Sequence, residues 1–401
     1  GKGFMPSSDP HEWGHTWWGG FVPNTYLKDI WNESFATYSE SVFARYGGAE
    51  NGRELINTLN WRRPRPAFGG QPYMVPLDKT ADALFGPSSE SGYSKGCLVM
   101  QNLEGTLGMP ELSKCMLAFR NRFDKSEEAA TWSDFEEIVN KVTGKNYSWW
   151  FNEWVRRPGL PSLKLANVRE SRTGSEYRVT AQIVQPAPAY RLTVPVWITT
   201  RSGDTVKKVV EVDSAATRIA LTCSSAPTKL MLDPEMMVPR IISAAELGGP
   251  EFGRGKMPLV IASRSGQALA NRLRNFGLQV HSDSSVRPDE LKSEDIILIG
   301  AADNCPLWTR WEKWCPFQAT SKAVRYHGKV YEGGNAVGSS QNPASPAHSM
   351  LWVTAGLRDP ASAFQLTGNA SVAVFDSSGA LVDGAARIVK GGPGVYTFAS
   401  R

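Results

Sequence analysis

The chain has 401 residues, 41% of them hydrophobic and 21% charged, which suits two or three domains with ordinary cores. Its net charge of +5 comes from Lys and Arg that are dispersed along the chain, so nothing indicates nucleic-acid binding. The longest apolar runs, such as Ile296–Gly300, have only strand length, and we expect no transmembrane segment. Five cysteines is an odd number, so at least one is unpaired or forms an intermolecular bond.

The first informative segment reads His11-Glu12-Trp13-Gly14-His15. Two histidines four residues apart share one face of a helix, so their imidazoles can chelate one metal ion. The glutamate after the first histidine can polarise a metal-bound water. Glu33 lies on a second predicted helix over Ile30–Tyr46 and is a credible third ligand. Two histidines and one glutamate with an open position form the ligand set of a hydrolytic zinc site rather than a structural one.

The following residues also favour helices. Helical periodicity covers 91–107, and a short helix is expected over 149–155. Ser133-Asp-Phe-Glu136 has the pattern of a capping box, which predicts a helix over 135–142. We therefore predict that residues 1–160 form a mostly helical domain.

Alternating apolar and polar residues then predict short strands separated by Gly, Pro and Ser turns. These strands are expected at 162–168, 176–184, 190–200, 205–212 and 217–222. Several short strands in succession are typical of a β-sandwich, which we place at 161–241.

Residues 242–401 have a third pattern. A strand at 258–262, a helix at 265–276 and strands at 278–281 and 296–300 predict βαβ units in an α/β domain. Further strands are expected at 323–332, 349–356 and 371–375, which would make the sheet mixed. The turn Ser263-Arg-Ser-Gly266 lacks a glycine-rich phosphate motif, so we interpret it as an ordinary strand-to-helix turn. We assign this domain no chemistry, and packing, a partner or surface attachment remain its possible roles.

Several segments together resemble a known family. His-Glu-Trp-Gly-His-Thr-Trp-Trp-Gly at 11–19, followed by Trp-Asn-Glu-Ser-Phe-Ala-Thr-Tyr at 31–38, is similar to the zinc aminopeptidase family of aminopeptidase N. The segment 91–96 resembles the family's Tyr-x-Lys-Gly motif, and 150–154 with 158–161 resembles its exit from the catalytic helices.

This resemblance covers residues 8–240 in order and spacing. It implies a gluzincin, that is, an HExxH metalloprotease with a thermolysin-like catalytic domain. The fold class implied is a multidomain α+β protein. The helical half of that catalytic domain comes first, the β-sandwich second and the α/β domain last.

The resemblance also implies a role for each motif residue. His11, His15 and Glu33 would bind Zn²⁺, and Glu12 would act as general base on the water that attacks a peptide substrate. Tyr93 would donate a hydrogen bond to the oxyanion formed at the scissile carbonyl.

Neighbouring residues are assigned supporting roles. Asn32 would orient a ligand, and Lys95 is expected to be a solvated or structural side chain. Trp17 and Trp18 are expected to pack the first helix.

The chain departs from the family in two ways. It has 17 residues between His15 and Glu33 where the family usually has 18, and we place the shortfall in the loop 19–24. A deletion within the second helix would instead rotate Glu33 by about 100° away from the metal. The family's Gly-Ala-Met-Glu-Asn strand, which binds the free amine of the substrate, does not occur in this sequence.

Only ten residues precede His11, too few for the sheet that normally covers this helix. We therefore expect that a second chain or an N-terminal fragment completes the catalytic domain. The first helices should then expose apolar surface.

Three functions remain open. The first is a zinc aminopeptidase, and the second is a zinc endopeptidase, suggested by the absent amine-binding motif. The third is a non-catalytic scaffold subunit that needs a partner chain. The composition leaves the compartment open, with a bacterial periplasmic or secreted location slightly favoured over the cytoplasm.

Overall fold

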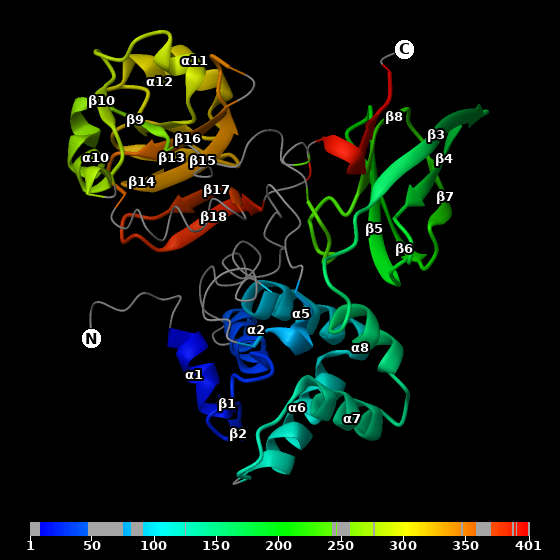
Figure 1. The fold of residues 1–401 in the computed structure, drawn as a ribbon. Helices are drawn as coiled ribbons and strands as arrows, with labels where there is room; N and C mark the ends of the chain where they lie inside the picture. The colour runs from blue at the N-terminus through cyan, green and yellow to red at the C-terminus, as the bar shows by residue number, and fades with distance from the viewer. Residues whose placement is uncertain are drawn as a thin grey trace. The chain divides into compact units, whose positions relative to one another are not determined.

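The computed structural model of the chain divides into two compact units (Figure 1). The first unit holds the described residues up to Ile242 together with Phe398 and Ala399, and the second holds those from Glu246 to Thr397. No helix among the described residues is long and apolar enough to cross a membrane. The described residues are 9–46, 75–81, 91–124, 126–242, 246, 257–275, 277–345, 348–357, 370–386, 389 and 391–399.

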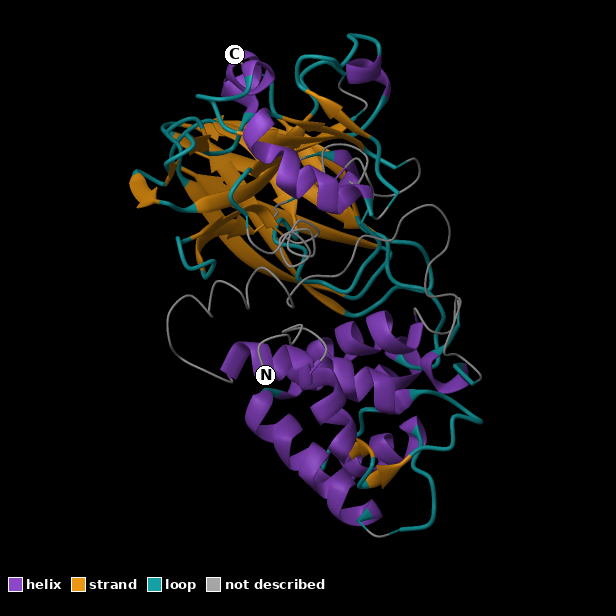
Figure 2. Ribbon diagram, turned by 90° about the vertical axis from the view of Figure 1, so that its left-hand side faces the viewer, coloured by secondary structure: helices purple, strands orange, loops and turns teal. Residues whose placement is uncertain are grey.

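The described part of residues 9–154 is dominated by helices (Figure 2). Aromatic side chains fill the space between them, with ring centroids 5.2 Å apart for Trp31 and Phe119 and 4.8 Å apart for Phe35 and Phe135. The helical elements are α1 (Asp9–Trp17), α2 (Trp31–Tyr46), the short helix η1 (Leu77–Lys79), the π-helical turn η2 (Ser91–Lys95), α5 (Gly96–Leu107), α6 (Met109–Phe123), α7 (Trp132–Thr143) and α8 (Ser148–Trp154). Two short strands, β1 (Trp18–Gly19) and β2 (Val22–Pro23), lie between α1 and α2.

The predicted capping box was wrong by two residues. Thr131, not Ser133, caps α7: its hydroxyl accepts the Asp134 N–H, and the Asp134 carboxylate accepts the Thr131 N–H. A hydroxyl residue and an acid with the same spacing occur two residues upstream of the predicted pair. Thr131 forms the cap because this position places the buried Trp132 in the first turn of the helix. α7 therefore begins three residues earlier than predicted.

Two further expectations for the helical part concern α6 and Trp17. A helix was expected around Cys115 but without bounds, and α6 begins where Pro110 in its first turn gives a favourable helix start. Trp17 was expected to pack α1 together with Trp18, but only Trp18 is buried, whereas Trp17 is 48% exposed.

After α8 the chain forms two antiparallel sheets. One has the order β3-β4-β7 and the other includes the order β8-β5-β6. Alternate residues of β4 and β5, such as Val179 and Val196, point into the core that the helices share. The strands are β3 (Lys164–Thr173), β4 (Glu176–Val184), β5 (Leu192–Thr200), β6 (Thr205–Val212), β7 (Ala216–Cys223) and β8 (Pro227–Leu232). The short strand β19 (Val395–Thr397) ends the second unit.

The second unit is built on a seven-stranded mixed sheet. Its order is β10-β9-β11-β16-β15-β17-β18, parallel over the first four strands and antiparallel over the rest. The strands are β9 (Leu259–Ala262), β10 (Val280–Ser282), β11 (Ile296–Gly300), β15 (Asn335–Gln341), β16 (Ser349–Thr354), β17 (Ala370–Phe375) and β18 (Leu381–Ala386). A protein with helices and several sheets agrees with the expected multidomain α+β class.

Both faces of this sheet are covered. Leu259 and Ile261 of β9 contribute to one apolar core, and the alternating Val260 and Ala262 contribute to another. α10 (Gln267–Arg274) belongs to the second core. The first core includes side chains of α11 (Glu290–Ser293), α12 (Pro306–Trp311) and the small sheet β12 (Gln318–Ala319), β13 (Ala323–Tyr326) and β14 (Lys329–Glu332).

Local chemistry explains the differences from prediction here. The expected strand 323–332 is a hairpin, because His327 and Gly328 both adopt positive φ and turn the chain. The Ser263 hydroxyl accepts the Gly266 N–H at the start of the short helix η3 (Arg264–Gly266), as an ordinary strand-to-helix turn requires. The expected helix 265–276 includes Phe276, which lies outside the described residues.

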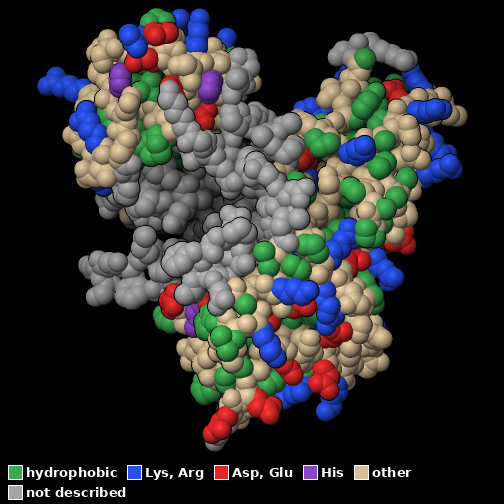
Figure 3. All heavy atoms as spheres, in the orientation of Figure 1, with side chains coloured by type: hydrophobic (Ala, Val, Ile, Leu, Met, Phe, Trp, Pro, Cys, Tyr) green, Lys and Arg blue, Asp and Glu red, His purple; other side chains and the backbone are tan. Residues whose placement is uncertain are grey.

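On the face drawn in Figure 3, Lys and Arg side chains are scattered among Asp and Glu. All five cysteines are free thiols, and four of them are buried.

Candidate metal centre

The centre is built where α1 crosses α2. Gly14 faces Ala36 so closely that an added Cβ would lie 3.1 Å from the Ala36 Cα. This close approach brings the face of α1 that carries His11 and His15 against Glu33 in the first turn of α2. A glycine between the two histidines thus sets the separation of the helices.

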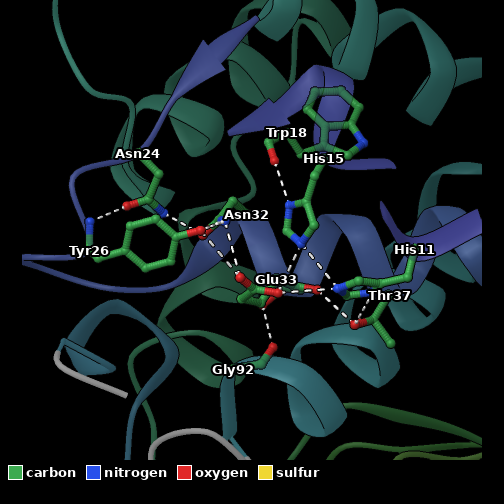
Figure 4. Close-up of polar contacts among 10 residues, drawn as sticks. His11, His15, Trp18, Asn24, Tyr26, Asn32, Glu33, Thr37 and Gly92 are labelled. Carbon is green, nitrogen blue, oxygen red and sulfur yellow. Dashed lines mark hydrogen bonds and ion pairs between the residues drawn. The ribbon is translucent and has the colours of Figure 1, made fainter. Parts of the chain in front are cut away.

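Three donor atoms converge at this crossing (Figure 4). The two Nε2 atoms of His11 and His15 lie 3.0 Å apart, and Glu33 Oε2 lies 3.3 Å and 3.1 Å from them. Zinc bonds of about 2.0–2.1 Å in a tetrahedral arrangement place neighbouring ligand atoms roughly 3.3 Å apart. The spacing and chemistry of the three donors therefore fit zinc with one position left open.

The other ring nitrogens determine how the histidines present their lone pairs. His15 Nδ1 lies 2.9 Å from the Trp18 carbonyl, which can only accept a hydrogen bond. His11 Nδ1 lies 3.4 Å from the Thr37 hydroxyl, which donates its own proton to the Glu33 carbonyl. Protons on both Nδ1 atoms are the arrangement that metal binding requires, because both Nε2 lone pairs would then face the centre.

The Glu33 carboxylate is ionised and held from both sides. Burial opposes its ionisation, but hydrogen bonds from His11 and His15 outweigh burial and hold its pKa well below the usual range. The bond to Glu33 in turn raises the pKa of His15. On the far oxygen, Oε1 accepts hydrogen bonds from the Tyr26 hydroxyl and the Asn32 amide, each at 3.3 Å.

Sequence reasoning found Asn32 but missed two residues of this network. The Asn32 amide nitrogen lies 2.6 Å from the Tyr26 hydroxyl, and the Asn32 oxygen accepts from Asn24 at 2.7 Å. The Asn24 side chain also accepts the Tyr26 N–H, which is an Asx-turn and the one local signal that could have indicated Asn24. Tyr26 adopts a positive φ of 57° in this loop, and no residue pattern in the sequence predicts this conformation.

Tyr93, on η2, lies at the edge of the centre. Its ring stacks on His11 with centroids 5.8 Å apart and an interplanar angle of 20°. Burial, reinforced by a hydrogen bond with Glu33, raises the pKa of Tyr93 above its usual value. The phenol therefore keeps its proton at neutral pH and can act as a donor.

Glu12 is not among the three converging donors. It is exposed on α1, and its carboxylate makes no hydrogen bond to any residue that the structure describes. Its negative charge contributes to the raised pKa values of His15 and Tyr93, after the hydrogen bond with Glu33 for His15 and after burial for Tyr93. A free carboxylate at this position can accept a proton.

The outer face of α1 is apolar, as expected for these first helices. Trp13 is 57% exposed and Leu117 of α6 is 59% exposed, with Trp17 and Phe21 alongside. Trp13 and Trp17 line a hollow of about 780 Å³ between α1 and α6. An apolar patch of this kind marks an interaction surface in soluble proteins.

Two helices that present two histidines and a glutamate define a metallopeptidase type of centre. Residues 10–154 match the Peptidase family M1 domain, which confirms the resemblance to the aminopeptidase N family over this segment. The position of Glu33 beside both histidines agrees with a shorter loop rather than a deletion within α2.

Curated relatives carry aminopeptidase names. "Probable aminopeptidase 2" of Sulfurisphaera tokodaii is 27% identical over 164 residues, 38% of this chain and 20% of that protein. "Aminopeptidase N" of Lactococcus lactis subsp. lactis is 28% identical over 164 residues, 38% of this chain and 18% of that protein. "Alanine/arginine aminopeptidase" of Saccharomyces cerevisiae is 25% identical over 180 residues, 42% of this chain and 20% of that protein. The chain spans about a fifth of the length of these relatives.

Proposed function

We propose that this chain is a zinc metallopeptidase that hydrolyses N-terminal peptide bonds as an aminopeptidase. The observation that carries the proposal is the convergence of His11, His15 and Glu33 donor atoms at zinc-ligand spacing, with Tyr93 at the edge. The family match over 10–154 and the names of the relatives support it.

The proposal extends to the domain organisation. Residues 1–160 would be the helical part of a thermolysin-like peptidase domain and 161–241 its β-sandwich. Residues 242–401 would be an α/β domain without a role in the chemistry.

The chain's own side chains would divide the reaction between them. Bound zinc would supply a Lewis acid that lowers the pKa of a water and polarises the peptide carbonyl. Glu12 would take the proton of that water and deliver it to the leaving amine, which balances the proton transfer. Tyr93 would donate a hydrogen bond to the carbonyl oxygen as negative charge develops on it.

Two other functions follow from specific observations. An endopeptidase would use the same three donor atoms and the same chemistry, which makes it the second candidate. The exposed Trp13 and Trp17 favour a third possibility, a scaffold subunit that acts only with a second chain or an N-terminal fragment.

A pair of substrates separates these functions. The full chain is assayed on a peptide with a free amino terminus and on the same peptide acetylated at that terminus. An aminopeptidase cleaves the free peptide and leaves the acetylated one intact. Equal cleavage of both, at internal bonds, would establish the endopeptidase, and zinc binding without cleavage of either would favour the scaffold.

A further inference from the structure

Lys95 was expected to be a solvated or structural side chain, and the first alternative is wrong. It is the last residue of η2, and its side chain is 0% exposed. Its Nζ donates a hydrogen bond of 2.6 Å to the main-chain carbonyl of Arg157, the one acceptor it has among the described residues. A lysine is rarely buried completely, so this position requires an explanation.

The turn that carries Lys95 fits closely against α2. An added Cβ at Gly92 would lie 2.2 Å from the Ile30 side chain, and one at Gly96 would lie 2.0 Å from the Ser34 hydroxyl. That hydroxyl donates to the Gly92 carbonyl at 2.7 Å. Ser34 directly follows the ligand Glu33, so η2 is fastened to the part of α2 that holds the centre.

Arg157, whose carbonyl accepts the hydrogen bond from Lys95, lies on a well-packed segment. Arg157 follows α8, and its guanidinium carbon lies 3.7 Å from the centroid of the Tyr190 ring. Two residues earlier, the Val155 carbonyl accepts the Leu77 N–H at 2.8 Å. The Arg157 carbonyl is therefore a fixed point to which η2 can be anchored.

The chemistry of a buried lysine suits an anchor. Burial lowers the pKa of Lys95 to about 7, so it is present in both protonation states near neutral pH. The ammonium and the neutral amine both carry N–H groups that can donate to a carbonyl. π-helical turns such as η2 are frequent at functional sites, where they direct a particular side chain.

We propose that Lys95 is a positioning residue for Tyr93: by bonding the Arg157 carbonyl it fixes the end of η2, and thereby the Tyr93 phenol beside His11. The kinetic consequence rests on the proposed peptidase function, whereas the placement of the ring does not. Gly92 and Gly96 would hold the turn against α2, and Lys95 would set its orientation.

The kinetic arm compares four variants of the full chain. Lys95→Met keeps the length of the side chain but removes the donor, and Lys114→Met, at an exposed lysine of α6, is the matched control. A misplaced catalytic group costs roughly tenfold to a hundredfold in rate, so kcat of Lys95→Met should fall by this factor with KM and zinc content unchanged. Because both changes act through the same phenol, Lys95→Met added to Tyr93→Phe should lower kcat no further than Tyr93→Phe alone.

The structural arm needs no activity. With ¹³C-labelled tyrosine, the Tyr93 ring signal is assigned by its loss in Tyr93→Phe. Its chemical shift should change in Lys95→Met, stay unchanged in Lys114→Met and return towards wild type in Lys95→Gln, whose amide can donate to the same carbonyl. If Lys95→Met does not fold, Lys95→Gln against wild type carries the test, with the Tyr93 signal and kcat expected near wild type.

Each outcome bears on one claim. A chain without peptidase activity overturns the proposed function, and the Tyr93 signal still decides the role of Lys95. An unchanged Tyr93 signal in a folded Lys95→Met overturns that role. Multiplicative losses of kcat in the double variant also overturn it. A Lys95→Gln variant that folds but displaces the Tyr93 signal as far as Lys95→Met does contradicts it too, because the donor would then not matter.

Discussion

Polar side chains gather at the crossing of α1 and α2 and in a hollow of the second unit, and these two places differ in kind. At the crossing of α1 and α2 they are ionisable and mutually fixed: two histidines, a glutamate with a lowered pKa and a tyrosine with a raised one. In the second unit, a hollow of about 240 Å³ includes residues that follow β9, β11 and β16. Its lining residues are Ser265, Gly300, Ala301, Asn304, Thr320, Ser321, Gly333, Gly334, Asn335, Thr354, Ala355, Gly356 and Ser377, none of which is ionisable.

The hollow in the second unit has a suitable position for a ligand but lacks the chemical groups found at the crossing of α1 and α2. The edge of a parallel sheet at the carboxyl ends of its strands is where α/β folds usually bind ligands, so the hollow has a suitable position. Without a carboxylate, imidazole or thiol in its lining, it offers no acid, base or strong metal ligand. We therefore place the chemistry in the helical part, and we expect substitutions there to affect activity more than substitutions in other regions.

The largest effect is expected from Glu12→Gln. Loss of a general base lowers kcat by about 10²–10⁴-fold, while zinc content should not change because Glu12 is not a ligand. Peptidase assays with metal analysis check this. The control in the second unit is Ser321→Ala in the hollow, which should leave kcat unchanged, and full activity of Glu12→Gln would show that another group is the base.

Asp29→Asn should change how stability depends on pH. Burial raises the pKa of Asp29 to about 7, so the folded state keeps its proton between about pH 4 and pH 7 while the unfolded state loses it. The carboxyl thus favours folding fully below pH 4, and this contribution is lost as pH rises to 7. The loss is on the order of 2–4 kcal/mol in the free energy of unfolding.

Urea unfolding of the full chain from pH 4 to pH 7.5 measures this slope. Asp29→Asn should flatten it, because the amide keeps a carbonyl oxygen for the Trp31 N–H but does not titrate. Asp213→Asn, at an exposed position, is the matched control and should retain the wild-type slope. An unchanged slope in Asp29→Asn would assign the effect to other groups.

Tyr26→Phe should weaken metal binding. It removes the hydroxyl that donates to Glu33 Oε1, and loss of a partner that orients a metal ligand typically costs about 10–100-fold in affinity. Competition with a zinc chelator measures this affinity. Tyr396→Phe, at an exposed tyrosine of β19, should show none of the effect, and wild-type affinity in Tyr26→Phe would mean that Asn32 alone orients Glu33.

The smallest effect is expected from Gly14→Ala. The new methyl group would lie 3.1 Å from the Ala36 Cα, so α1 must move by a few tenths of an ångström. We expect a cost of about 1 kcal/mol in stability and a modest loss of zinc affinity. Gly105→Ala on α5, where no atom lies within 4 Å, is the control and should be neutral or stabilising.

Local patterns in the sequence predicted a large part of this structure. The strands 176–184 and 205–212 coincide with β4 and β6, because alternation of burial shows directly in residue type. Helical spacing also predicted that His11 and His15 share one face, whereas Glu33 was predicted from its position on a second helix and from the family resemblance. Which lysine is buried or which tyrosine bends into the site depends on contacts between distant segments, so the contacts of Lys95 and Tyr26 could not be predicted.

Similar reasons explain the missed elements. β15 and β18 are rich in Gly, Ala and Ser, and it is their place in the sheet rather than their β-propensity that makes them strands. The misplaced capping box shows the converse. Two threonine- or serine-to-acid pairs lie two residues apart, and packing of the buried Trp132 decides between them.

The central claim is that α1 and α2 together hold one zinc ion, and metal analysis of three forms of the full chain tests it most directly. After dialysis against trace zinc, the wild type and Glu12→Gln should each retain about one zinc per chain, and His15→Ala should retain almost none, because only the last removes a ligand. Equal zinc in His15→Ala and the wild type, or none in any of the three, would contradict the account.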